Sequence, residues 1–246
     1  MRAFIQCSPL TKLPFNPNVF NAHYGLEKMG FECVFFSGYD ELDTNYHSKS
    51  EIIVGGIEMI RRRLSHFGIE IPMVDYPEEL RPYLKRNIEK STINTIANQP
   101  SRWPIFVKSV EQKRLTGKVI RSISDLVGCG CCDEDYEVYV SEPLNMVAEW
   151  RIFVRYGKVL DAKLYKGDWT AHYDADIIKS AIEDYKTAPD AYGIDFAVTD
   201  KGDTVLIEVN DGFALGSYGM PFWNYSKFLL TRWAQMTDTI DEFWYL

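Results

Sequence analysis

Long apolar runs are missing from this sequence of 246 residues. No stretch approaches the roughly eighteen consecutive apolar residues that a membrane-spanning helix requires. The opening segment, MRAFIQCSPL, also lacks the extended hydrophobic core of a secretory signal peptide. We therefore expect a cytoplasmic protein without membrane contacts.

The sequence also has few cysteines and histidines, and its net charge is negative. The five cysteines show no disulfide-like spacing, which favours reduced thiols in a reducing compartment. Cys129, Cys131 and Cys132 lack the CxxC partner or nearby histidine that would complete a tetrahedral zinc site, so the sequence leaves their role open. The four histidines form no Ser-His-Asp pattern, and a net charge of −8 argues against broad contact with nucleic acid.

The sequence up to residue 97 alternates strand-like and helix-like patterns, which is typical of a βαβ opening. The predicted strands are residues 2–7, 32–36 and 70–74, and the predicted helices are residues 19–29, 52–67 and 80–97. Gly55 and Gly56 fit either close helix packing or the approach of a ligand to the backbone. Residues 98–104 contain two prolines and form the best linker candidate. We expect an N-terminal βαβ domain over residues 1–97 and a second domain over residues 98–246.

A strand with a single lysine follows the linker. Residues 105–110 alternate around Lys108, residues 111–117 form a polar loop containing Lys113 and Arg114, and a second strand begins at Lys118. Cations next to a glycine-containing loop suit phosphate oxygens. The alternative is a solvent-facing strand lysine beside a basic turn. No GxxxxGK[ST] segment is present, so this is not a Walker-type phosphate loop.

Two further segments carry candidate ligand-binding groups. The strand over residues 136–144 stops at Pro143, and its free backbone groups could bond an adenine edge. Residues 149–165 predict a hairpin that bears Arg151 and Lys163, but the sequence does not fix whether both cations share a face.

Residues 193–210 predict a second hairpin, with its turn at Lys201-Gly202. This register pairs Ile194 with Val209, Phe196 with Ile207 and Val198 with Val205, and it leaves three polar residues on the other face: Asp195, Glu208 and Asn210. Opposed carboxylates repel unless one is protonated or a cation lies between them. Two carboxylates and an amide oxygen suit Mg²⁺, which shares its ligands with nucleotide phosphates. The alternative is a solvated hairpin with acidic residues on its wet side.

The order of these features resembles the ATP-grasp superfamily from about residue 100 onward. The segments that carry the resemblance are PIFVK with the following RLTGKV, then VYVSEPL, EWRIFV with YGKVLDAKLY, and GIDFAVTDKGDTVLIEVN. The chain looks most like the clade named for two arginines and one lysine, and it also resembles relatives of cell division cycle protein 123. The resemblance implies an α+β fold in which ATP lies between two lobes, here residues 98–142 and 143–246, after a small βαβ domain. It also implies a ligase that phosphorylates a carboxylate to an acylphosphate, which an amine then attacks.

The resemblance further implies roles for individual residues. Lys108 matches the lysine on the α- and β-phosphates, and the loop ending at Lys118 matches the phosphate-covering loop. The adenine hinge corresponds to Val140, Ser141, Glu142 and Leu144. Glu142 or Glu149 is the candidate for the ribose hydroxyls.

The remaining matches lie in the second lobe. Arg151 and Lys163 correspond to cations for the γ-phosphate and acylphosphate, and Asp195, Glu208 and Asn210 to the Mg²⁺ ligands, with Asn210 also at the reaction centre. One departure is Ile194, where many ligases have arginine. The glycine-rich residues 211–219 are either an acceptor-binding loop or a plain loop.

We therefore expect an ATP- and Mg²⁺-dependent carboxylate-amine ligase whose partners are ATP and small carboxylate and amine substrates. The alternative is an ATP-binding assembly or regulatory factor without small-molecule turnover. The sequence leaves the substrates and the oligomeric state open.

Overall fold

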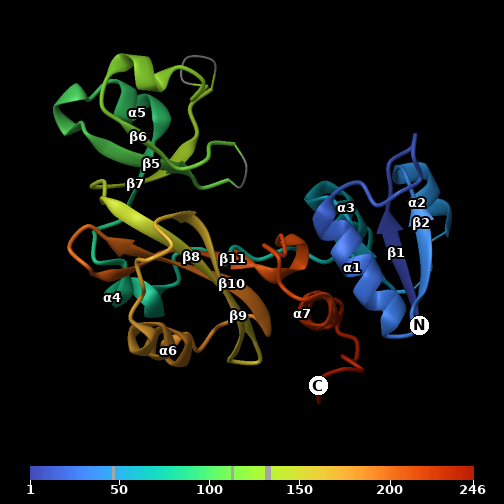
Figure 1. Cartoon of the computed structure of the whole chain (residues 1–246). Helices are drawn as coiled ribbons and strands as arrows, with labels where there is room; N and C mark the ends of the chain where they lie inside the picture. Colours follow the sequence, from blue (N-terminus) through green and yellow to red (C-terminus); the bar gives the residue numbers. More distant parts are fainter. Residues whose placement is uncertain (46–47, 112–113, 131–133) are drawn as a thin grey trace. The chain divides into compact units, whose positions relative to one another are not determined.

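The chain, described here by a computed structural model over residues 1–45, 48–111, 114–130 and 134–246, folds into two compact units (Figure 1). Unit 1 comprises Met1–Tyr83 and Val147–Leu246, and unit 2 comprises Leu84–Met146. Sheets and helices occur together, as the predicted α+β class requires. The domain boundaries proposed from the sequence, at residues 97/98 and 142/143, stay a prediction. Within the described ranges, no helix is long and apolar enough to cross a membrane.

Unit 1 opens with the predicted βαβ arrangement. Its parallel sheet has the order β2-β1-β3, from β1 (Arg2–Gln6), β2 (Glu32–Phe36) and β3 (Ile52–Val54). The helices of this region are α1 (Pro17–Lys28), α2 (Tyr39–Asn45) and α3 (Ile57–His66). Helix α1 begins where the Asn16 side chain accepts a hydrogen bond from the Val19 N–H, and Pro17 fits the first turn because it needs no amide partner there.

The glycine pair separates β3 from α3, so the prediction of one helix over residues 52–67 was wrong in its first part. Gly56 precedes the first turn of α3 and donates its N–H to Gln6 Oε1 at 2.7 Å. A Cβ atom on Gly55 would lie 2.7 Å from the same oxygen. Close packing against the side chain of Gln6 on β1 therefore accounts for this pair.

The connection from residue 67 to residue 97 also differs from prediction. Residues 70–74 form no strand, and residues 80–97 do not form one helix. Four short elements occupy this stretch: η1 (Glu78–Leu80), α4 (Arg81–Leu84), β4 (Glu89–Thr92) and α5 (Ile93–Ala97). Lys85 adopts a φ of +52°, which ends α4, and β4 then pairs with β7. Strand pairing distant in sequence overrides the polar, helix-like composition of this segment.

Unit 2 is built on an antiparallel sheet of order β4-β7-β5-β6. Its other strands are β5 (Ile105–Ser109), β6 (Lys118–Ile120) and β7 (Glu137–Ser141), and its 3-10 turns are η2 (Pro100–Arg102) and η3 (Ile123–Leu126). Ile93 and Ile96 of α5 pack with Val107, Val138 and Val140 of the sheet to form its core.

The remaining sheet belongs to unit 1 and has the order β11-β10-β8-β9. Its strands are β8 (Met146–Arg155), β9 (Lys158–Gly167), β10 (Ala191–Thr199) and β11 (Thr204–Asp211), accompanied by α6 (Ala175–Asp184), η4 (Gly212–Ala214) and α7 (Phe222–Thr237). Every residue of β10 is buried. Most of the aromatic residues near the end of the sequence lie in α7, which packs on the core.

The hairpin of β10 and β11 has the predicted register on one side of a bulge and not on the other. Ile194 lies opposite Val209 and Asp195 opposite Glu208, as predicted. Beyond Asp195 the register shifts, so that Phe196 pairs with Leu206 rather than Ile207, and Val198 pairs with Thr204 rather than Val205. A bulge adds one residue to one strand and moves the pairing by one position.

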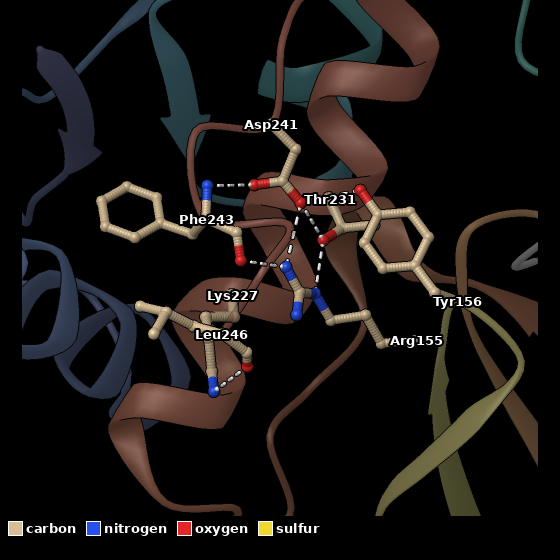
Figure 2. Close-up of polar contacts among 7 residues, drawn as sticks. All are labelled: Arg155, Tyr156, Lys227, Thr231, Asp241, Phe243 and Leu246. Carbon is tan, nitrogen blue, oxygen red and sulfur yellow. Dashed lines mark hydrogen bonds and ion pairs between the residues drawn. The ribbon is translucent and has the colours of Figure 1, made fainter.

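A buried polar network holds the far end of β8 against α7 and the segment that follows α7 (Figure 2). Arg155 Nε donates to Thr231 Oγ1 at 2.7 Å, and Arg155 Nη2 donates to Asp241 Oδ2 at 3.1 Å and to the Phe243 carbonyl at 2.6 Å. The hydroxyls of Tyr156 and Thr231 also donate to Asp241 Oδ2. Because Arg155 lies four residues beyond Arg151 on the same strand, this network anchors the strand that carries the candidate site.

Candidate functional site

A buried ion pair joins two neighbouring strands of unit 1. Arg151 Nε and Nη2, on β8, donate hydrogen bonds of 2.8 and 2.6 Å to the two carboxylate oxygens of Asp195, on β10. Asp195 is fully buried. Burial raises the pKa of Asp195 to about 6, although the hydrogen bonds and charge of Arg151 oppose that rise. Ionising the buried Asp195 carboxyl group is therefore costly, and the Arg151 guanidinium stabilises the ionised form.

Glu208 and Asn210 lie beside this pair. Glu208 is opposite Asp195 across the hairpin, its Oε1 lies 3.7 Å from Arg151 Nη2, and it accepts a hydrogen bond from Asn210 Nδ2 at 2.9 Å. The structure therefore brings together all three predicted metal ligands and one predicted phosphate-binding cation.

The donor set fits Mg²⁺. With both carboxylates ionised and Arg151 charged, these residues carry one net negative charge, and carboxylate and amide oxygens are the ligands that Mg²⁺ prefers. Among the described residues, no group of three His, Cys, Asp or Glu side chains could hold a metal ion, so a site at this position would combine the two carboxylates with the amide oxygen of Asn210.

Lys163 lies on the same face as Arg151. The two residues are directly opposite each other in the β8–β9 pair, which answers the question that the sequence left open. Lys163 Nζ forms an ion pair of 2.9 Å with Asp161, and Lys166 forms one of 2.5 Å with Glu149. The strands thus present several cations, each partly neutralised by a neighbouring carboxylate.

Two tyrosines that sequence analysis missed enclose the Arg151 guanidinium. Its Cζ lies 5.7 Å from the ring centre of Tyr165 and 4.8 Å from that of Tyr218. Burial raises the pKa of the Tyr165 phenol, and the charges of Asp195 and Glu149 raise it further. The available signal for Tyr165 was its position two residues after Lys163, on the same strand face. Tyr218 lies in the glycine-rich loop, which the sequence did not place next to Arg151.

Gly193 leaves room for the Leu215 side chain beside Arg151. A Cβ atom on Gly193 would lie 3.6 Å from Arg151 Cδ and Nε and 2.5 Å from Leu215 Cδ2.

Ile194 is fully buried, and adjacent strand residues point to opposite faces, so its side chain faces away from the Asp195 carboxylate. The cation beside Asp195 therefore comes from the neighbouring strand, and an arginine in place of Ile194 would not point to this carboxylate.

Unit 2 carries the other predicted residues. Lys108 of β5 is opposite Tyr139 of β7, and Val107 is opposite Val140, which places the predicted phosphate lysine on the strand next to the predicted adenine hinge. Lys118 begins β6, and its Nζ donates to the Val127 carbonyl at 3.4 Å.

The predicted adenine hinge lies at the end of β7 and just after it, in unit 2. Ser141 donates its hydroxyl to the Glu142 carbonyl at 3.0 Å, the exposed Glu142 carboxylate accepts from the Asn87 N–H at 3.4 Å, and Leu144 is half-buried. Lys113 lies outside the described residues, as do Cys131 and Cys132. Cys129 is buried and its thiol contacts the Asp125 carbonyl at 3.4 Å, which is compatible with a structural role.

Comparison with known structures gives one fold. A D-alanine–D-alanine ligase from Bacillus anthracis complexed with ATP has a TM-score of 0.60 at 15% identity, covering 97% of this chain and 98% of that one. D-cycloserine synthetase has a TM-score of 0.57 at 11% identity, over 94% and 99% of the two chains. N5-carboxyaminoimidazole synthetase from Staphylococcus aureus has a TM-score of 0.54 at 11% identity, over 94% and 77%.

These similarities show that the chain shares the fold of these proteins. Comparison with curated proteins gave no match. The family described as ATP-grasp domain, R2K clade family 2, matches residues 83–228, which is more than half of the chain. The chain belongs to this family, as the sequence motifs predicted.

Proposed function

We propose that this protein is an ATP- and Mg²⁺-dependent ligase that joins a small carboxylate to an amine through an acylphosphate. The observation that carries the proposal is the cluster of Arg151, Asp195, Glu208 and Asn210 on adjacent strands of a fold shared with ligases. The D-alanine–D-alanine ligase complexed with ATP supports ATP as the nucleotide.

In this proposal, Asp195, Glu208 and Asn210 hold Mg²⁺, which when bound supplies positive charge to the phosphate oxygens. Attack of a carboxylate oxygen on the γ-phosphate brings negative groups together, and catalysis then depends on positioning and charge stabilisation rather than on a protein nucleophile. Arg151, held rigidly by Asp195 and by the rings of Tyr165 and Tyr218, is a preorganised cation for that charge. Lys163 supplies a second cation on the same face.

The residues of unit 2 complete the proposal. Lys108 binds the α- and β-phosphates, assisted by the loop that ends at Lys118. Val140, Ser141, Glu142 and Leu144 receive the adenine, and either Glu142 or Glu149 binds the ribose hydroxyls. The exposed Glu142 carboxylate and the neighbouring strands β5 and β7 support this arrangement.

The deciding experiment measures ADP release from Mg-ATP in the presence of a small-metabolite extract. Glu208→Gln is expected to abolish the extract-dependent signal, because it removes one charge from the metal site. Asp203→Asn, the same acid-to-amide change in the exposed turn of the same hairpin, is the matched control and is expected to retain it. Mg²⁺-dependent ATP binding without turnover would favour the ATP-binding assembly factor, and absence of ATP binding would refute both functions.

A further inference from the structure

Strand β2 has one free edge. In the sheet order β2-β1-β3 it pairs with β1 alone among the described strands. Glu32 donates its N–H to the Met1 carbonyl, and Cys7 donates to the Phe36 carbonyl at 2.8 Å. Because backbone groups alternate along a strand, Glu32, Val34 and Phe36 direct their N–H and C=O groups toward β1, whereas Cys33 and Phe35 direct theirs outward. Among the described residues, Cys33 and Phe35 therefore offer backbone donors and acceptors at this edge that no other strand pairs with.

The other sheet edges of the described chain carry features that discourage pairing. Strands β3 and β6 have three residues each, and β4 has the polar sequence EKST. Strand β9 holds four charged residues (Lys158, Asp161, Lys163 and Lys166), and its pairing with β8 contains register shifts. Strand β11 is bulged, and the Val209 N–H bonds to the Asp75 side chain at 2.9 Å. Such devices are the usual protection of edge strands.

Strand β2 has none of these protections. Its sequence, ECVFF, contains no proline and no lysine, its single charge is at its first residue, and its pairing with β1 is regular. Phe35 is 40% exposed, and its ring packs edge-on against His23 of α1 at 4.9 Å. Phe20, one turn before His23 on the same flank of α1, is 59% exposed. An edge strand that lacks these protections and lies next to exposed aromatic rings favours pairing with another strand.

We propose that this edge, the β2 edge, pairs antiparallel with the β2 edge of a second copy of the chain. A two-fold axis at Val34 sets Cys33 of each copy opposite Phe35 of the other. The backbone groups of Cys33 and Phe35 point outward, so the two strands would form four hydrogen bonds. The two Val34 residues would lie opposite each other as a pair without hydrogen bonds. The two three-stranded sheets then continue as one.

Two side chains of α1, the carboxylate of Glu27 and the imidazole of His23, agree with this register. Glu27 interacts electrostatically with Cys33, and His23 contacts Phe35. When Cys33 of one copy lies opposite Phe35 of the other, Glu27 on α1 of the first copy approaches His23 on α1 of the second. The two-fold symmetry produces this approach twice. Glu32, the only charged residue of β2, lies opposite Phe36 of the other copy, so no like charges face each other across the pair.

Sedimentation velocity on the full chain tests the proposal. We expect the wild type to sediment with the mass of two chains, and Phe35→Lys to raise the dissociation constant at least about tenfold, because a charged side chain replaces an aromatic one at the covered edge. Ile123→Lys is the matched control, since Ile123 is 75% exposed and lies in unit 2, outside the sheet that contains β2, and it should remain dimeric. A monomeric wild type, which would leave the edge to a strand of another protein, or a Phe35→Lys variant that stays dimeric, would overturn the proposal.

Cross-linking provides a second measurement that does not depend on Phe35→Lys folding. Residues opposed without hydrogen bonds have Cα atoms about 4.5 Å apart, which a disulfide can span. Val34→Cys should therefore form a covalent dimer on oxidation, faster than the wild type and faster than Val159→Cys on β9. Equal rates for the three proteins would refute the pairing.

Discussion

Arg151 and Asp195 form a two-bond ion pair inside unit 1, although 43 residues separate them in the sequence and they lie on different hairpins. Both side chains are almost fully buried. The desolvation of each charge is therefore offset mainly by the other, and the pair depends on β8 and β10 being neighbours.

Replacing Arg151 should therefore destabilise the fold as well as remove activity. We expect Arg151→Met to lower the free energy of unfolding by about 3–5 kcal/mol, because Asp195 would be left buried and unpaired. Urea denaturation followed by circular dichroism measures this change. Arg62→Met is the matched control, since Arg62 forms an exposed ion pair with Asp43, and it should change stability far less. Equal losses in the two variants would contradict the buried character of the pair.

The Arg155 network should act as a coupled unit. Arg155 and Asp241 share Thr231 as a partner, and Asp241 also accepts from Tyr156, so removing one member disturbs the bonds of the others (Figure 2). We expect a double-mutant cycle of Arg155→Met and Asp241→Asn to give a coupling energy of about 1–3 kcal/mol. Additive effects of the two substitutions would show that the segment after α7 is held by its apolar contacts instead.

Acid should weaken the same network. Burial opposes ionisation of Asp241, but hydrogen bonds from Thr231, the Phe243 N–H, Tyr156 and Arg155 outweigh it and lower its pKa below the ordinary value of 3.8. A carboxyl group whose pKa is lower in the folded state stabilises the fold above its unfolded pKa, and this contribution is lost as pH falls through the folded pKa. The stability difference between wild type and Asp241→Asn should therefore shrink below about pH 4. Denaturation curves between pH 7 and pH 2 test this, and a constant difference would contradict it.

Local sequence patterns predicted the elements that depend on neighbours along the chain. The hairpin prediction placed Asp195 opposite Glu208 correctly, although the strands pair one position off near the turn and the bulge next to Asp195 restores the predicted register. The register beyond Asp195 was wrong, since a bulge has no clear signature in an apolar strand. Likewise, the helical spacing of residues 52–67 concealed the short strand β3, whose three residues are buried by pairing with β1.

Contacts between distant segments could not be predicted in the same way. The sheet order places β8 between β10 and β9, so Arg151 meets both Asp195 and Lys163, and neither meeting follows from spacing. Tyr218 reaches Arg151 from a loop whose conformation the sequence does not specify. The polar β4 forms only because β7 offers it a partner. The sequence thus predicted the chemical groups of the site more fully than it predicted how they are held.

Two glycines offer a test of how tightly the edge of the site sheet is packed. Gly167, at the end of β9, has a φ of +92°, and a Cβ atom there would lie 2.1 Å from the Val147 carbonyl oxygen. Gly202, in the β10–β11 turn, has a similar φ of +83°, with no atom within 4 Å of an added Cβ. Both positions disfavour alanine for the same backbone reason, at a cost of about 1 kcal/mol or more. At Gly167 the added methyl group also overlaps backbone that cannot rotate away.

Gly167→Ala should therefore lower the free energy of unfolding by at least about 2 kcal/mol more than Gly202→Ala. Because the two φ angles are nearly equal, the difference between the variants isolates the steric overlap from the cost of the left-handed backbone. Urea denaturation of both variants under the same conditions gives this difference directly. Equal losses would mean that β8 shifts away from β9 without cost, and the paired strands that hold Arg151 opposite Lys163 would then be more pliable than their register indicates.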